Sequence, residues 1–225
     1  MGSDSLITPP ETEDRPTAPE ALEKKSTVST SKLMTLRDLV TTSVFSVIYF
    51  ALSGIGALMS VVLPSIGVSI IVPVTALVAA PAFMVASAKV PKFGAITIIG
   101  IVMGAAFFVA GHMPVSWVVP IVFGLLADFI ASIGHYRSKA WTLASFVVFA
   151  YATTGPVIPM YFTMEAYKES LLAKGKSLEY VTQVTAPISW TAFAIMLVVT
   201  FVCAILGGLL GQRLVTRHFV KAGLA

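Results

Sequence analysis

Fifty consecutive residues carry no charged side chain: LVTTSVFSVIYFALSGIGALMSVVLPSIGVSIIVPVTALVAAPAFMVASA, residues 39–88. A helix of about 20 apolar residues crosses a bilayer, so this run predicts two membrane spans, joined by a turn at Pro64, Ser65 and Gly67. The rest of the chain is similar, since 56% of its 225 residues are hydrophobic and only 12% are charged. Soluble domains average about 25% charged residues. We therefore predict a polytopic membrane protein.

The apolar segments predict six spans within an all-α membrane domain of residues 34–216. Residues 164–172, which precede the last span, have the apolar spacing of a helix and predict a short amphipathic surface helix. Residues 1–33 are rich in Pro, Thr, Ser and Glu, which predicts a disordered cytoplasmic tail. Residues 217–225 form a second, basic cytoplasmic tail. The predicted spans are 36–63, 68–88, 93–111, 115–133, 140–162 and 188–214.

The basic residues predict the orientation of these spans. If both ends of the chain are inside the cell, only Lys168, Lys174 and Lys176 lie outside, which leaves 12 of the 15 lysines and arginines inside. This asymmetry follows the positive-inside rule and suits the cytoplasmic membrane of a bacterium, with lipid as the surroundings. The net charge of +4 comes from residues at helix ends, so we expect no nucleic-acid partner.

Prolines predict irregular helices. Pro73 and Pro81 predict a kink or break in the second span, because proline leaves a backbone carbonyl without its donor. Pro156 and Pro159, three residues apart, predict a break in the fifth span.

Small residues recur four positions apart, a spacing that lets membrane helices approach closely. For the third and sixth spans the favoured interpretation is packing within the protein. For the first span, an external partner helix is an equal alternative, which is implied by the family resemblance given below and not by the spacing. The pairs are Thr42 with Ser46, Ser53 with Ala57, Gly100 with Gly104, and Gly207 with Gly211.

Asp128 is the one ionisable residue well inside a predicted span. A charge at the bilayer centre costs roughly 3 kcal/mol, so this carboxylate needs a partner. The favoured interpretation is a structural hydrogen bond, or a side chain that extends to the nearby interface and the Arg137 loop, and the alternative is a proton or ligand site. The predicted spans contain no second side chain that could pair with Asp128 in acid–base or nucleophilic chemistry. We therefore expect no catalytic residues and no enzyme. Cys203 and three scattered histidines provide no metal or cofactor site.

One predicted membrane face gathers aromatic, proline and sulfur side chains near the ends of spans three to six. Such residues form the interfacial aromatic belt of many membrane proteins. They also suit an apolar small-molecule pocket, because the broken fifth span needs protein or a cavity beside it. Both interpretations remain open. The candidate substrate-binding residues are His112, Met113, Trp117, Pro159, Met160, Tyr161 and Trp190.

The opening of the first span, LRDLVTTSVFS (residues 36–46), resembles the first helix of S components, the substrate-binding membrane subunits of energy-coupling-factor (ECF) transporters. In that family an Ala-x-x-x-Ala pair docks on the transmembrane coupling subunit. The matching positions here are Thr42 and Ser46, which are small but not alanine. The resemblance therefore implies that these two residues contact a partner.

Within this group the chain is similar to the Trep_Strep proteins over about residues 33–215, through LLADFI (125–130), GPVIPMYF (155–162) and GKSLEYV (175–181). The resemblance implies capture of a vitamin-like, metal-related or tetrapyrrole small molecule, powered by a coupling subunit and two cytoplasmic ATPases. The chain has no GxxxxGK[ST] phosphate loop, so ATP hydrolysis would lie in those partners. The alternatives are a stand-alone secondary transporter or channel, and a membrane scaffold.

Overall fold

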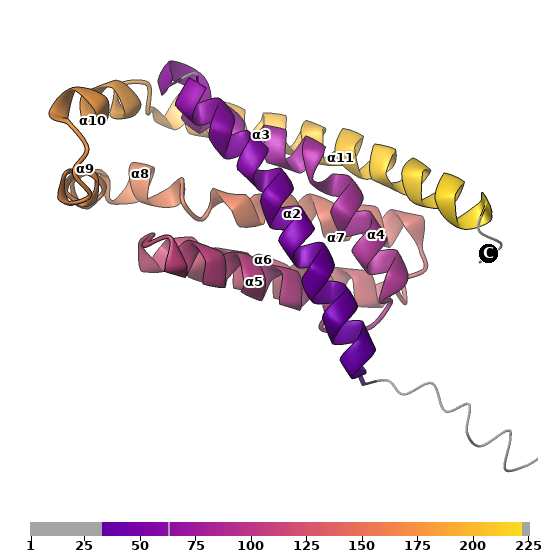
Figure 1. Ribbon diagram of the computed structural model, residues 1–225. Coiled ribbons are helices and arrows are strands. Elements are labelled where there is room, and N and C mark those ends of the chain that lie inside the picture. The colour runs from indigo at the N-terminus through magenta and orange to yellow at the C-terminus, as the bar shows by residue number, and fades with distance from the viewer. Residues whose placement is uncertain (1–32, 63, 222–225) are drawn as a thin grey trace, which may run out of the picture. The chain divides into compact units, whose positions relative to one another are not determined.

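The chain divides into two units, residues 1–32 and 33–225. A computed structural model describes residues 33–62 and 64–221, without the side chains of residues 60, 61, 64–68 and 218–221. These residues form helices and no strand, which confirms the all-α prediction for them (Figure 1). The predicted tails lie mostly outside this description. The elements are α2 (Leu36–Val62), α3 (Pro64–Val78), α4 (Ala80–Lys89), α5 (Ala95–Val109), α6 (Pro114–Ile133), α7 (Lys139–Ala150), the 3-10 helix η1 (Tyr151–Thr154), α8 (Ile158–Phe162), α9 (Met164–Ala173), α10 (Leu178–Thr185) and α11 (Trp190–Lys221).

Three described helices are long and apolar enough to cross a membrane, along Leu36–Met59, Pro114–Ile133 and Trp190–Arg217. The pair α3–α4, bent by 43°, is a fourth candidate if it counts as one span. By contrast, α5 has 15 residues and α7 has 12. At about 1.5 Å per residue these helices reach about 22 and 18 Å, less than the roughly 30 Å hydrocarbon core. The structure therefore has three or four full-length candidates where the sequence predicted six spans.

Prolines act largely as predicted. The bend between α3 and α4 confirms the kink in the second segment. The fifth segment is also interrupted, because α7 ends at Ala150 and the chain continues through η1 to the separate helix α8. The predicted turn at Pro64 is wrong, since this residue opens α3. Proline suits the first helical position, where its missing N–H would have had no partner within the helix.

Two short helices connect α8 to α11. A helix predicted at residues 164–172 is confirmed as α9, in which no residue is buried, and its place on a membrane surface stays a prediction. The sequence did not predict α10, where the Ser177 side chain caps the helix by accepting a hydrogen bond from the Tyr180 nitrogen at 3.2 Å. Val181 and Val184 are the buried residues of α10. The last helix, α11, runs to Lys221 and so passes the predicted end of the sixth span.

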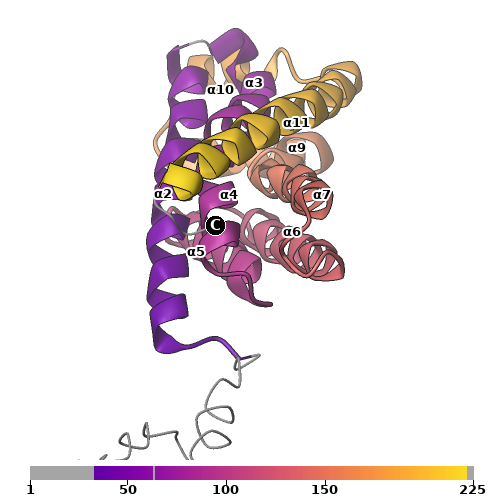
Figure 2. The ribbon, with the colours of Figure 1, turned by 90° about the vertical axis from the view of Figure 1, so that its right-hand side faces the viewer.

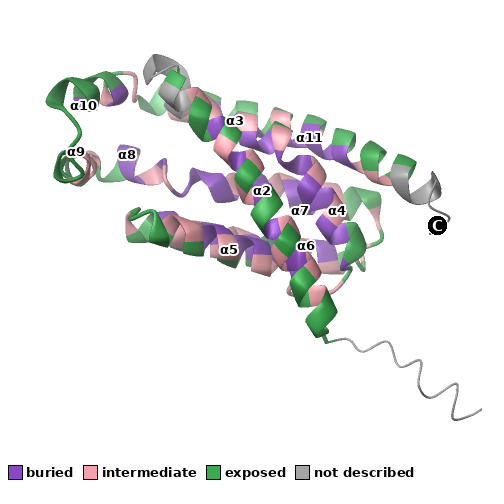
Figure 3. Ribbon diagram, viewed as in Figure 1, coloured by how far each residue is buried: buried purple, intermediate pink, exposed green. Residues whose placement is uncertain are grey.

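Aromatic side chains from α2, α4 and α7 fill the core between the helices. The ring of Tyr49 stands edge-on to Phe149 at a centroid distance of 5.2 Å. Phe83 lies 5.0 Å from Phe146, and all four side chains are fully buried. Exposed apolar residues cover the outer faces instead, as Figure 3 shows for α2 and α11. This inside-and-outside distribution is what a helix bundle in lipid requires.

Glycines allow the backbones of neighbouring helices to touch. A Cβ at Gly100 of α5 would overlap the Pro120 carbonyl oxygen of α6, and one at Gly207 of α11 would lie 2.6 Å from the Ala76 carbonyl oxygen of α3. The packing role predicted for the small residues of the third and sixth spans is confirmed.

The bundle has two chemically different ends. The basic end consists of the α4–α5 loop, the α6–α7 loop and the C-terminal part of α11, and its cations include Lys92, Arg137, Lys139 and Arg213. The opposite end carries α8, α9 and α10, and is called the α9 end below (Figure 1). Figure 2 looks toward the basic end and shows α2 standing along one side of the other helices.

Candidate functional site

A cavity of about 340 Å³ opens at the α9 end. This volume lies near the lower limit of small-molecule sites in proteins, which are usually about 300–1,000 Å³. The walls come from six elements and from the α5–α6 and η1–α8 connections. The lining residues are Phe50, Ser53, Gly54, Ala57, Ile71, Thr75, Phe107, Ala110, His112, Thr153, Pro156, Val157, Met160 and Tyr167.

The interrupted segment between α7 and α8 forms one wall. Pro156 has no backbone N–H to continue a helix, and Val157 and Met160 are buried beside the cavity. Gly155 lets this segment approach α6, because a Cβ there would lie 2.5 Å from the Ser116 carbonyl oxygen. The helix break predicted from the prolines therefore shapes the cavity.

Helix α2 forms another wall, with Phe50, Ser53, Gly54 and Ala57. A Cβ added to Gly54 would meet no atom within 4 Å, so this position faces open space. Two residues later, a Cβ at Gly56 would lie 2.6 Å from the Thr75 hydroxyl oxygen. One glycine of α2 thus widens the cavity, while the other permits contact with α3.

The polar groups of the cavity are uncharged. The Ser53 hydroxyl donates to the Tyr49 carbonyl at 2.8 Å, and the Thr153 hydroxyl donates to the Ala150 carbonyl at 2.9 Å. Thr75 makes a longer bond of 3.4 Å to the Ser53 carbonyl. No Asp, Glu, Lys or Arg is among the lining residues. The site therefore suits a neutral molecule with a largely apolar body.

His112 and Tyr167 add two titratable groups to the lining. Loss of water around the ring and the nearby Lys174 ammonium lower the pKa of His112. The Lys174 amino group is held there by donating to the Gly111 carbonyl at 2.7 Å. Burial raises the pKa of Tyr167 to about 12, with a smaller contribution from Tyr180. Both cavity residues are therefore neutral near pH 7.

Of the seven predicted substrate-binding residues, two line the cavity. His112 lies in the α5–α6 connection, and Met160 is 7% exposed on α8. Pro159 is buried in α8 beside Met160 but is not a lining residue. Met113 precedes α6 as its N-cap residue, and Trp117 packs edge-on against Phe108.

The other two predicted residues form an aromatic cluster next to the cavity. The ring of Tyr161 lies 4.6 Å from Phe193 and 5.9 Å from Trp190. Trp190 is 60% exposed, which suits the aromatic belt that was the alternative interpretation. The predicted residues thus fall into two sets: His112 and Met160 line the cavity, whereas Tyr161 and Trp190 belong to an aromatic cluster beside it.

Sequence reasoning missed the contribution of α2 and α3. Ser53 and Ala57 were interpreted as a helix-packing pair, yet both line the cavity. The available signal was the cluster of small and polar residues, Ser53, Gly54 and Thr75, within an otherwise apolar run. Spacing alone does not distinguish packing from a cavity wall, because both need small side chains.

Hydrogen bonds within the protein hold the Asp128 carboxylate in place. It is fully buried, and its Oδ2 atom accepts hydrogen bonds from the backbone nitrogens of Gly94 and Thr97 and from the Thr97 hydroxyl at 2.7–3.0 Å. Its Oδ1 atom accepts from the Tyr136 hydroxyl at 2.8 Å. The first N–H groups of a helix lack partners within the helix, and a carboxylate there is favourable. These bonds support the interpretation that Asp128 has a structural role. The carboxylate is not among the residues that line the cavity.

Thr42 and Ser46 do not form an exposed docking surface. Both are fully buried against other helices, and the Ser46 hydroxyl bonds back to the Thr42 carbonyl at 2.8 Å. Their side chains therefore belong to the interior of the bundle. The implied contact of these two residues with a partner subunit stays a prediction, and they offer no exposed side chain for it.

The long apolar helices and their exposed apolar faces define an integral membrane protein. A family model for hypothetical bacterial integral membrane proteins, Trep_Strep, matches residues 36–221, and the chain belongs to this family. No curated protein and no solved structure matches the chain.

Proposed function

We propose that the chain is the substrate-capture subunit of an uptake transporter and binds a neutral, vitamin-like small molecule in the cavity at the α9 end. The single observation that carries this proposal is the 340 Å³ cavity, which has apolar walls, uncharged polar groups and an open Gly54 position. Small-molecule sites combine such walls with a few polar groups.

The proposed topology has both chain ends inside the cell and six membrane segments, two of them α3–α4 and α7–η1–α8. The basic end would then face the cytoplasm and the cavity would open outward. The distribution of Lys92, Arg137, Lys139 and Arg213 supports this orientation. Outward opening is the arrangement that uptake requires.

The proposed partners are an ECF-type coupling subunit and two ATPases, because the chain contains no phosphate loop of its own. Because Thr42 and Ser46 are buried, we expect the coupling subunit to contact the exposed face of α2 instead. Val40, Val44 and Val47 lie there and are 52–61% exposed. Asp128 does not suit the coupling-ion site of a stand-alone transporter, because four hydrogen bonds already occupy its two oxygens.

The test is purification of the full chain from its native membrane in mild detergent, followed by mass spectrometry of retained proteins and small molecules. We expect a coupling subunit, ATPases and one enriched neutral compound. The Gly54→Leu variant should lose the compound but keep the proteins, because leucine fills the cavity from α2. Ala194→Leu introduces the same side chain at an exposed position of α11, away from both the cavity lining and the exposed α2 face, and should retain both.

Two results would contradict the proposal. Recovery of the chain alone, with uptake by vesicles that contain only this chain, would favour a stand-alone transporter. Equal compound retention by wild type and Gly54→Leu would show that the cavity is not the capture site.

A further inference from the structure

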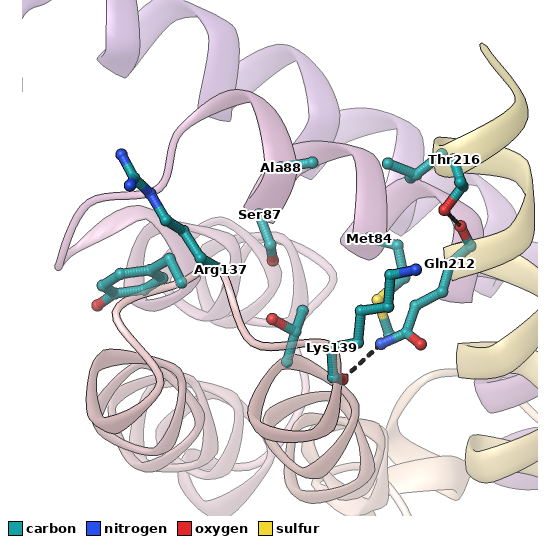
Figure 4. A pocket seen from close by; sticks show the side chains of 10 residues that line it. Met84, Ser87, Ala88, Arg137, Lys139, Gln212 and Thr216 are labelled. Atoms are coloured by element: carbon teal, nitrogen blue, oxygen red, sulfur yellow. Dashed lines mark hydrogen bonds between the residues drawn. The ribbon is translucent and has the colours of Figure 1, made fainter. Parts of the chain in front are cut away.

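A second pocket lies at the basic end, outside the proposed capture site. Its volume is about 180 Å³, and it is enclosed by the end of α4, the α6–α7 loop and the last turns of α11. Figure 4 shows Arg137, Lys139, Gln212 and Thr216 around it. This pocket is cationic, whereas the cavity at the α9 end is neutral.

The two cations of this pocket are not neutralised. Neither Arg137 nor Lys139 forms an ion pair with a carboxylate of the described residues. Gln212 fixes the start of α7 by donating from Nε2 to the Lys139 carbonyl at 2.7 Å, which Figure 4 marks. The N-terminus of α7 adds partial positive charge, and its Ser138 side chain does not cap it.

Ser87 provides an independent sign of a ligand. This residue is 2% exposed, it lines the pocket, and its hydroxyl has no hydrogen-bond partner. Figure 4 shows the hydroxyl directed into the space between α4 and the start of α7. A buried hydroxyl without a partner is unfavourable unless another molecule supplies one. Together with two unpaired cations, a free hydroxyl donor favours an anion with several acceptor oxygens.

We propose that this pocket binds the phosphate headgroup of an anionic membrane lipid. Phosphate provides the acceptor oxygens that Ser87, Arg137 and Lys139 require. A lipid source is favoured because the pocket lies at the ends of membrane helices and exposed Leu209 and Leu214 flank it on α11. Basic pockets between membrane helices bind lipid headgroups in this way. The lipid would clamp α4, α7 and α11 together.

The test is native mass spectrometry of the purified full chain, titrated with phosphatidylglycerol, with phosphatidylethanolamine or with inorganic phosphate. We expect phosphatidylglycerol to bind at least about tenfold more tightly than phosphatidylethanolamine, and Arg137→Gln with Lys139→Gln to weaken it about 25-fold, or about fivefold for each charge. Ser87→Ala should weaken binding about fivefold without lowering the thermal midpoint, because it removes an unpartnered hydroxyl. The matched control is Lys168→Gln with Lys176→Gln at the α9 end, which should bind as wild type.

Three outcomes would overturn the proposal. The first is wild-type lipid binding by the double variant or by Ser87→Ala. The second is equal binding of the two lipids. The third is inorganic phosphate binding as tightly as phosphatidylglycerol, which would exclude a lipid source. If the variants bind lipid like the wild type but lose a co-purifying protein, the proposal is also overturned, and the pocket would instead bind a protein partner.

Discussion

Asp128 caps a helix that begins 33 residues earlier in the chain, because its Oδ2 atom lies 2.7 Å from the Gly94 nitrogen at the start of α5. Gly94 has a φ of +101°, a conformation that glycine adopts far more readily than other residues. The same carboxylate holds Tyr136, which also has a positive φ, in the α6–α7 loop. One buried side chain thus fixes two turns at the basic end.

Asp128→Ala should destabilise the protein strongly, by at least about 3 kcal/mol, because it leaves the buried donors of Gly94, Thr97 and Tyr136 without an acceptor. Asp128→Asn should lose less, since its amide oxygen still accepts hydrogen bonds. Denaturant unfolding of the detergent-solubilised variants measures both values. Wild-type stability of Asp128→Asn combined with complete loss of uptake would instead indicate a proton or ligand role.

Gly54 and Gly56 provide a matched pair on α2. Gly54→Ala should raise the free energy of unfolding by up to about 1 kcal/mol, because alanine is the better helix former and its Cβ meets open space. Gly56→Ala should lower it by about 1–3 kcal/mol, since the new Cβ would lie 2.7 Å from the Ile71 carbonyl oxygen. The thermal midpoints of the two variants measure these effects. If both midpoints shifted in the same direction, Gly54 would not face open space while Gly56 contacts α3.

The pKa of His112 should lie below its ordinary value of 6.5. Between that value and the lowered one, the unfolded state binds more protons than the folded state, so stability decreases as pH falls through this window and is fully present above it. A ¹³C-labelled histidine titration by NMR, with His112→Gln for assignment, measures the pKa.

Lys174→Gln should raise the pKa of His112 toward 6.5, because it removes a neighbouring positive charge. Lys168→Gln, within α9, which ends one residue before Lys174, is the control, since Lys168 pairs with Glu165 at 3.0 Å. An unchanged pKa in Lys174→Gln would show that Lys174 does not act on the ring.

The proposed orientation can be tested with single cysteines. In a Cys203→Ser background, Ala173→Cys on α9 should react with a membrane-impermeant maleimide in intact cells, whereas Ala140→Cys at the start of α7 should react only after lysis. Both alanines are exposed, and Cys203 is the one native cysteine. Reversed labelling would invert the topology and place the cavity inside.

The helices and their interruptions were readable from sequence because they depend on local properties. The uncharged run of residues 39–88 contains most of α2, all of α3 and most of α4, and the prolines near residues 73, 81 and 156 marked the irregular segments. The surface helix α9 followed from its apolar spacing.

The candidate site was harder to predict from the sequence, because its residues come together only when the helices pack. The small and polar residues at Ser53, Gly54 and Thr75 suit helix packing as well as a cavity wall, so they do not by themselves show that α2 and α3 leave a space between them. Likewise, the partners of Asp128 are backbone N–H groups, which have no signature in the side-chain sequence. The burial of Thr42 and Ser46 depends on which face of α2 meets the bundle, and small residues are compatible with either face.

The hydroxyl bonds inside the cavity also determine what kind of molecule it selects. Ser53, Thr75 and Thr153 each direct their single proton to a backbone carbonyl, so they offer only lone pairs to a ligand. A molecule rich in N–H or O–H groups finds acceptors there, whereas one that carries only carbonyl or ether oxygens meets like partial charges. The side of the cavity formed by these three hydroxyls therefore selects N–H and O–H groups of a ligand, whereas donors for ligand carbonyl or ether oxygens come from the neutral His112 ring and the Tyr167 hydroxyl.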